Sequence, residues 1–175
     1  MSTKPTNSNE LRNVFLNYFK SQDHLILPSS SLIPANDPTL LLTNSGMAQF
    51  KSYFSGQLIP PHPRITTSQK CFRTTDIEEV GDDTHLTLFE MLGNFSFGNY
   101  FKKEACEMAL DLMLNHLDFD IERLYFTVYE SDDEAESIWL DLGIPIEKIY
   151  RFGDKDNWWG PAGEEGPCGP SSEIN

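Results

Sequence analysis

The chain has 175 residues, a net charge of −14 and 39% apolar residues. This length is enough to bury a hydrophobic core, whereas no apolar run approaches the roughly 20 residues that a membrane-spanning helix needs. The strong negative charge argues against non-specific binding of nucleic acid, because phosphate contacts require lysine and arginine.

The N-terminal sequence and the cysteines limit the class of protein further. The first ten residues, MSTKPTNSNE, contain no apolar signal-peptide core, so we expect a cytoplasmic protein without a membrane segment. Cys71, Cys106 and Cys168 are widely spaced and odd in number, which argues against a disulfide framework and against a cysteine-based zinc site. The four histidines do not have ligand spacing, so we expect any metal ion to arrive with a ligand.

The first third of the chain predicts one helix followed by shorter elements. Residues 11, 14, 15, 18 and 19 are apolar, which is the spacing of one helix face. Asn7 with Glu10 resembles a capping box, and we expect the helix to end near Asp23. The run TLLLT, Thr39 to Thr43, predicts a buried strand, and residues 47–54 return to helical spacing.

Two extended runs, residues 64–73 and 85–92, are joined by an acidic loop and predict a hairpin. The first run carries Arg64, Lys70 and Arg73 and no acid, and the second carries aromatic and aliphatic residues that suit a half-buried strand. A guanidinium can hold a phosphate through two parallel hydrogen bonds, and an aromatic ring can cover a base. The hairpin therefore predicts a nucleotide site.

The second half predicts a helix at 100–117, a strand at 124–129 and a helix that ends at Leu142. Ser131 with Glu134 forms a capping box for the last of these, and Gly143 stops it. Residues 147–152 predict a short extended piece. From Gly153 the sequence is dense in glycine and proline and predicts a loop that carries two tryptophans. The order of elements favours an α+β fold with an antiparallel sheet flanked by helices.

The glycine spacing of residues 93–98, GNFSFG, is that of a phosphate-binding loop. Asn99 and Tyr100 stand where that loop requires Lys and then Ser or Thr. We therefore reject a P-loop at this position.

Cys71-Phe72-Arg73 is followed, after the acidic loop, by HLTLFEMLGNF. This aromatic–Arg pair with a later His-xxx-Phe resembles motif 2 of the class II aminoacyl-tRNA synthetases, an aromatic–Arg pair and then His/Arg-xxx-Phe. The run FEMLGNFSFGNYFK is similar to the alanyl-tRNA synthetases in particular. SSSLIPANDPTLLLTNSGMAQFK resembles their motif 1 region, and DNWWGPAGEEGPCGPSSEI resembles their Trp segment and GPCGP loop. The likeness runs from about Leu11 to the last residue.

The resemblance implies a role for five residues. Arg73 would be the catalytic residue, because it would hold the α-phosphate of ATP and the carboxylate of the amino acid. His85 would contact the outer phosphates, Phe89 would stack on adenine, and the backbone of Met91 would read the edge of the base. Trp159 would border the ATP site and form a wall of the small alanine pocket.

The resemblance also implies a larger enzyme with a six-stranded antiparallel sheet. Its substrates would be ATP with Mg²⁺, L-alanine and tRNA(Ala), and residues 1–175 would be the N-terminal portion of the catalytic domain. The family's motif 3 would lie beyond Asn175, so we expect no alanyl-adenylate from these residues alone. The alternative is a non-catalytic, synthetase-derived nucleotide-binding or regulatory module.

Three positions depart from the general pattern. The acid expected two residues after Arg73 is replaced by Thr75, with Asp76 following. The acid expected four residues after Phe89 is replaced by Gly93, and Glu90 lies closer. Many relatives have His-His where this chain has His85 and then Leu.

Structural roles for the same side chains remain as alternatives. Arg73 could lie at a strand end on the surface, and His85 could be an exposed turn residue. Phe89 could belong to the core, and at least one of Trp158 and Trp159 is expected to be structural. We expect Cys168 to be a packed loop thiol, and Ser171, which stands where relatives often carry Cys, argues against a required thiol there.

Overall fold

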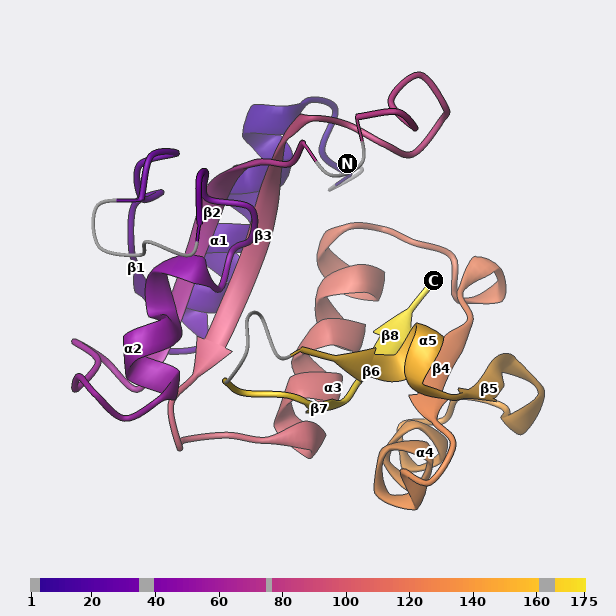
Figure 1. The fold of residues 1–175 in the computed structure, drawn as a ribbon. Coiled ribbons are helices and arrows are strands. Elements are labelled where there is room, and N and C mark those ends of the chain that lie inside the picture. Colours follow the sequence, from indigo (N-terminus) through magenta and orange to yellow (C-terminus); the bar gives the residue numbers. More distant parts are fainter. Residues whose placement is uncertain (1–3, 35–39, 75–76, 161–165) are drawn as a thin grey trace. The chain divides into compact units, whose positions relative to one another are not determined.

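The computed structural model describes residues 4–34, 40–74, 77–160 and 166–175 (Figure 1). These residues form two compact units. The N-terminal unit is Asn7–Asn99, and the C-terminal unit is Tyr100–Asn175 with residues 4–6. Each unit combines helices with a three-stranded sheet. The α+β fold class predicted from the sequence is therefore confirmed.

The N-terminal unit contains α1 (Ser8–Ser21), β1 (Leu25–Ile26), η1 (Ala48–Phe50), α2 (Lys51–Phe54), β2 (Arg64–Phe72) and β3 (Leu88–Ser96). The C-terminal unit contains α3 (Lys102–Asp111), η2 (Leu112–His116), η3 (Ile121–Arg123), β4 (Phe126–Tyr129), α4 (Asp133–Asp141), η4 (Ile146–Lys148), β5 (Ile149–Phe152), α5 (Asp154–Asn157), β6 (Trp158–Trp159), β7 (Gly169–Pro170) and β8 (Ser172–Ile174). The label η marks 3-10 helices, except that η2 is a π-helical turn.

Helix α1 begins and ends with local capping interactions. The side chain of Asn7 accepts a hydrogen bond from the Glu10 N–H at 3.0 Å, as the sequence predicts. At the other end, Asp23 has a φ of 63°, and the His24 N–H bonds back to the Phe19 carbonyl at 3.0 Å. This is a Schellman-type end in which Asp23 takes the left-handed position usually held by glycine.

The β2–β3 ladder separates the side chains of the hairpin onto two faces. Its register pairs Arg64 with Ser96 and Phe72 with Leu88 without interruption, and β1 pairs parallel to β2 on the other edge. Because side chains alternate along a strand, the odd-numbered residues share one face, which we call the site face. The even-numbered residues share the other, which we call the helix face because Glu90 pairs there with Arg12 of α1.

Aromatic packing covers one end of the site face. The Phe50 ring of η1 lies 4.6 Å from the Phe95 ring of β3, and Phe54 lies 4.7 Å from Phe97, measured between centroids. Phe95 lies across Gly93, where an added Cβ would come within 2.7 Å of the ring. Any larger residue at position 93 would therefore force the Phe95 ring to move.

The core of the C-terminal unit surrounds β4, the central strand of the sheet β5-β4-β8. Strand β4 pairs parallel to β5 and antiparallel to β8. Phe126 and Val128 of β4 are fully buried, and the Phe126 ring lies 4.7 Å from the ring of Trp139 on α4. Cys106 of α3 also belongs to this core, and burial raises the pKa of its thiol to about 11.

The strand expected at Thr39 to Thr43 is wrong for residues 40–43, and Thr39 lies outside the described residues. Residues 40–43 have no strand structure, and Leu41 is 86% exposed. The Thr43 N–H instead bonds the Leu32 carbonyl, and the Thr43 carbonyl accepts from the Phe72 N–H. The apolar residues predict a strand, but the backbone of Thr43 bonds a loop residue and the end of β2 instead of a neighbouring strand.

The second strand of the hairpin starts and ends later than predicted. We expected residues 85–92, whereas β3 is Leu88–Ser96, so His85 belongs to the preceding loop. Gly93 and Asn94 disfavour strand by propensity, but the ladder with β2 and the ring of Phe95 outweigh that preference.

Three further expectations for the C-terminal unit need correction. The cap of α4 is Asp132, whose carboxylate accepts from the Ala135 N–H at 3.1 Å, rather than Ser131. The helix expected from residue 100 begins at Lys102, and Phe101, which precedes it, is 74% exposed. The described part of the segment after Gly153, expected to be loop, contains α5, β6, β7 and β8.

The described strands do not form the single six-stranded antiparallel sheet that the resemblance implies. They form two sheets of three strands and one of two. Each three-stranded sheet includes one parallel pair, β1 with β2 and β4 with β5. The antiparallel part of the prediction holds for β2–β3, β4–β8 and β6–β7.

Candidate functional site

Arg73 and Phe89 lie on the same face of the hairpin. Cys71 is paired with Phe89 in the ladder, and the Arg73 N–H continues the ladder by donating to the Thr87 carbonyl at 2.9 Å. The guanidinium carbon of Arg73 lies 5.3 Å from the centroid of the Phe89 ring, within cation–π range. A cation and an aromatic ring therefore meet at the open end of the site face.

Arg73 is held in place by the turn that precedes η1. Its Nε donates to the Asn44 carbonyl at 3.0 Å, and the two terminal nitrogens are the remaining donors of its fork. This fork suits a phosphate or a carboxylate. Because the guanidinium covers one face of the Phe89 ring, a base that stacks on Phe89 must use the other face or displace Arg73.

Cys71 and Met91 extend the site face toward its centre. Burial raises the pKa of the Cys71 thiol, so this group serves as protonated packing beneath Phe89. The Met91 sulfur accepts from the Gly46 N–H at 3.2 Å. Gln69, opposite Met91, is fully buried and accepts from the Ser30 N–H and the Gln49 side chain, both at 2.8 Å.

The phase of the ladder determines which peptide groups face outward. The Lys70 N–H and the Phe72 N–H both bond away from β3, to the Ser29 hydroxyl and the Thr43 carbonyl. The backbone N–H and carbonyl groups of the odd-numbered residues of β2 therefore bond β3. Met91 is paired with Gln69, so its own N–H and carbonyl point toward β2. The outward peptide groups of β3 are those of even-numbered residues such as Glu90. A base-reading role for the Met91 backbone stays a prediction.

The basic run of β2 is divided between the two faces. Arg64 and Lys70 are even-numbered and lie on the helix face, whereas Arg73 lies on the site face. Glu90, the acid nearest to Phe89 in the sequence, is also on the helix face, where its carboxylate accepts from Arg12 at 2.8 and 2.9 Å. Glu90 therefore does not supply the site face with the acid of the general pattern. Thr75 and Asp76 lie outside the described residues.

His85 lies in the acidic loop between two carboxylates. Its Nδ1 is 2.6 Å from Asp82 Oδ2, and its Nε2 is 3.2 Å from Glu79 Oε2. The hydrogen bond from His85 is the main reason that the pKa of Asp82 lies well below its ordinary value. The contact of His85 with the outer phosphates stays a prediction, and the acids around it were not singled out from the sequence.

Trp159 belongs to the C-terminal unit, on the short hairpin β6–β7. It pairs with Gly169, is 45% exposed and precedes Gly160, whose φ of 75° requires glycine. The neighbouring Trp158 ring lies 5.5 Å from the Tyr129 ring, which is the structural role expected for one of the two tryptophans. A pocket shared by Trp159 and Arg73 stays a prediction.

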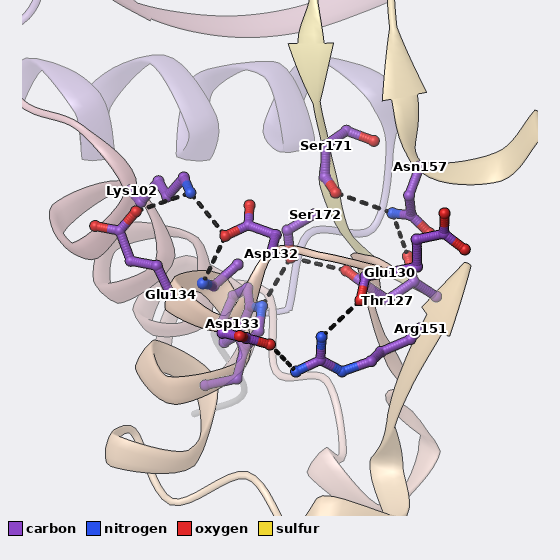
Figure 2. Close-up of polar contacts among 12 residues, drawn as sticks. Lys102, Thr127, Glu130, Asp132, Asp133, Glu134, Arg151, Asn157, Ser171 and Ser172 are labelled. Atoms are coloured by element: carbon purple, nitrogen blue, oxygen red, sulfur yellow. Dashed lines mark hydrogen bonds and ion pairs between the residues drawn. The ribbon is translucent and has the colours of Figure 1, made fainter. Parts of the chain in front are cut away.

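A buried asparagine joins the two ends of the Trp159 hairpin to β4, as Figure 2 shows. The Asn157 amide donates to the Thr127 hydroxyl at 3.0 Å and to the Ser171 carbonyl at 3.1 Å. Ser172 donates to the Thr127 carbonyl and accepts from the Trp139 indole, both at 2.8 Å. The sequence analysis did not predict this network, because its residues are distant in the sequence and its segment is rich in glycine and proline.

Charged pairs elsewhere in the C-terminal unit have structural roles (Figure 2). The Lys102 ammonium bonds the buried Asp132 carboxylate at 2.7 Å and Glu134 at 2.8 Å. Burial alone would raise the pKa of Asp132, but the bonds from Lys102 and the Ala135 N–H outweigh burial and hold the pKa below its ordinary value. This acid therefore stabilises the start of α4 as a carboxylate.

The described residues contain no group of three or more His, Cys, Asp or Glu that could hold a metal ion. None of the helices in the described ranges is long and apolar enough to span a membrane.

Comparison with known proteins agrees with the sequence motifs. The family model described as "tRNA synthetases class II (A)" matches residues 10–175, and the chain therefore belongs to the class II tRNA synthetases. It is 59% identical over 172 residues to a protein of Leptospira interrogans named alanine–tRNA ligase, covering 98% of this chain and 18% of that protein.

Two relatives from other bacteria carry the same name. The chain is 57% identical over 168 residues to the alanine–tRNA ligase of Dehalococcoides mccartyi, covering 96% of this chain and 19% of that protein. It is 56% identical over 173 residues to that of Rubrobacter xylanophilus, covering 95% and 20% respectively. The chain thus spans about one fifth of the length of these relatives.

Proposed function

We propose that this chain is part of an alanine–tRNA ligase and contributes to activation of L-alanine by ATP. The observation that carries this proposal is the Arg73–Phe89 pair, a forked cation beside an aromatic ring on one face of a hairpin. Family membership and the names of the relatives support it. Residues 1–175 would be the N-terminal portion of the catalytic domain, acting in the cytoplasm, where the whole protein would transfer alanine to tRNA(Ala).

The proposed reaction needs positioning and charge stabilisation rather than a protein nucleophile. An oxygen of the alanine carboxylate attacks the α-phosphorus of ATP, and the bond to pyrophosphate breaks. Arg73 would hold both the carboxylate and the α-phosphate, so the two reacting groups approach each other and the developing charge is neutralised. The Asn44 carbonyl holds Nε and so fixes the direction of the fork before substrate arrives.

The other proposed contacts surround this centre. Phe89 would stack on adenine, the backbone of Met91 would read the edge of the base, and His85 would contact the outer phosphates. Mg²⁺ carried by ATP would neutralise charge on those phosphates. Trp159 would bound a pocket small enough for alanine.

Binding of ATP tests the proposal directly. Arg73→Ala removes charge-assisted hydrogen bonds worth about 1.5–3 kcal/mol, so ATP affinity of the chain should fall at least about tenfold. Lys70→Ala is the matched control, because it removes a cation from the same strand on the other face. Titration calorimetry that finds equal affinities for the two variants would contradict the assignment of Arg73.

A second candidate is a non-catalytic, synthetase-derived nucleotide-binding or regulatory module. Both candidates predict ATP binding, but they differ in turnover. We expect these 175 residues alone to exchange no pyrophosphate into ATP, and the longer protein to do so in the presence of alanine. Pyrophosphate exchange at a normal rate by the 175-residue chain would refute the expectation that activation of alanine needs the longer protein.

A further inference from the structure

The loop between β2 and β3 contains one carboxylate that organises the residues after it. One oxygen of Asp82 accepts from the Thr84 N–H at 2.9 Å and from the His85 N–H at 2.6 Å. The other accepts from the Thr84 hydroxyl at 3.3 Å and lies 2.6 Å from the His85 Nδ1. Asp82 therefore fixes both the backbone and the ring of His85.

The two ring nitrogens of His85 contact two different carboxylates, and one contact is shorter than the other. The Nδ1 contact with Asp82 is short and is supported by the backbone bonds of the same carboxylate. The Nε2 contact with Glu79 is longer, at 3.2 Å, and the Glu79 side chain is 66% exposed, against 45% for Asp82. A carboxylate oxygen lies at each ring nitrogen, an arrangement that suits a doubly protonated ring, in which both nitrogens donate.

We propose that Asp82 is a positioning residue for His85, and that Glu79 occupies the place at Nε2 which an outer phosphate oxygen of ATP takes on binding. The inference rests on the proposed function and adds two residues to it. Asp82 would keep its contact in both states, so the ring stays oriented. Glu79 would move away from Nε2, because the single N–H there cannot point at a phosphate and a carboxylate together, and the two negative groups repel each other.

This arrangement predicts opposite effects on ATP binding from Asp82→Asn and Glu79→Gln, with Asp83→Asn as a control. Each of the three substitutions removes one negative charge from the loop. If the loop acted only through net charge, all three would strengthen ATP binding. We expect Asp82→Asn to weaken it by about fivefold, roughly the net worth of one hydrogen bond. Glu79→Gln should strengthen it, and Asp83→Asn should change it little.

The experiment combines ATP titration of the 175-residue chain with nitrogen NMR of the His85 ring. Without nucleotide, the unaltered chain, Glu79→Gln and Asp83→Asn should show the Nδ1 hydrogen-bond signature, and Asp82→Asn should lose it. With ATP, the Nε2 signal should shift in the unaltered chain and in Asp83→Asn. Equal thermal unfolding of the variants confirms that the exposed loop can be altered without loss of fold.

The outcomes separate the inference from the function on which it rests. If the unaltered chain binds ATP but Asp82→Asn binds it equally or more tightly, the inference fails and the proposed function stands. Weaker binding by Glu79→Gln would also overturn the inference. If the unaltered chain binds no ATP, both fail. A Nδ1 signature that persists in Asp82→Asn would refute the positioning role by itself.

Discussion

Two arginines, Arg151 in the C-terminal unit and Arg73 in the N-terminal unit, show how differently the units use charge. Arg151 bonds Glu136 at 2.7 and 2.8 Å and Asp133 at 2.8 Å. The described contacts of Arg73 are a backbone carbonyl and an aromatic ring. A guanidinium between two carboxylates is neutralised and joins elements of the fold. One held by neutral groups keeps its charge and can attract an anion.

The same contrast separates two phenylalanines. Phe126 is fully buried against Trp139 in the core of the C-terminal unit, whereas Phe89 is half-buried beside Arg73. One ring therefore contributes to stability by packing, and the other presents surface to a ligand. The contrast can be tested separately in each unit, because all three tryptophans, Trp139, Trp158 and Trp159, lie in the C-terminal unit and report on it by fluorescence.

The largest expected effect follows from deletion of the core ring. Phe126→Ala should destabilise the C-terminal unit by about 3–5 kcal/mol, because it removes buried surface and leaves a cavity. Phe89→Ala should leave the fluorescence transition in urea nearly unchanged and weaken ATP binding by about 1–3 kcal/mol, the usual value of a base–aromatic stack. A large shift of that transition in Phe89→Ala would contradict the separation of roles.

A smaller effect should follow from Asp132→Asn, which keeps a cap for α4 but removes the charge that faces Lys102. We expect a loss of about 1–2 kcal/mol at neutral pH, as for a hydrogen bond between charged groups. Since the pKa of Asp132 is lowered in the folded state, its contribution is present above the unfolded value of about 3.9 and is lost as the pH falls through the folded value. The fluorescence transition should show this acid sensitivity in the unaltered chain and less of it in the variant.

The N-terminal unit should respond to a different pH range. Burial, the largest cause, lowers the pKa of His24, against the bonds of its ring to the Gln22 and Phe19 carbonyls. Because the unfolded chain then binds a proton more readily, stability is full above about pH 6.5 and falls as the pH drops below it. The protection factors of α1 amides against hydrogen exchange, which are corrected for the intrinsic effect of pH, should fall in this range, and His24→Asn should remove the dependence. Equal sensitivity of the C-terminal unit would argue against this origin.

The smallest effect is expected at Arg151. Arg151→Gln removes exposed ion pairs, which contribute little to stability because solvent and salt screen them, so the fluorescence transition should shift little. ATP affinity should stay unchanged, in contrast to the loss expected for Arg73→Ala. A loss of affinity similar to that of Arg73→Ala would end the distinction between the two arginines.

Local patterns accounted for much of the fold and failed where partners were distant. The cap at Asn7 and the hairpin were predictable, because capping and alternation depend on neighbouring residues. Residues 40–43 were misassigned, since their apolar character did not reveal that the Thr43 backbone bonds Leu32 and Phe72. The Asp82 contact with His85 spans three residues, and the spacing of an acid before Thr84 and His85 could have indicated it as a local turn.

Contiguous residues were enough to indicate the family, the α+β class and the candidate residues, because motifs and periodicity are local properties. The pairing of the strands was needed to show that Arg73 and Phe89 share one face while Glu90 lies on the other face with Arg12 of α1. That outcome depends on the register of β2 with β3, and a shift of one residue would move every side chain of one strand to the opposite face. The tertiary structure likewise placed Asn157 beside Thr127 and Ser171, which are far apart in the chain.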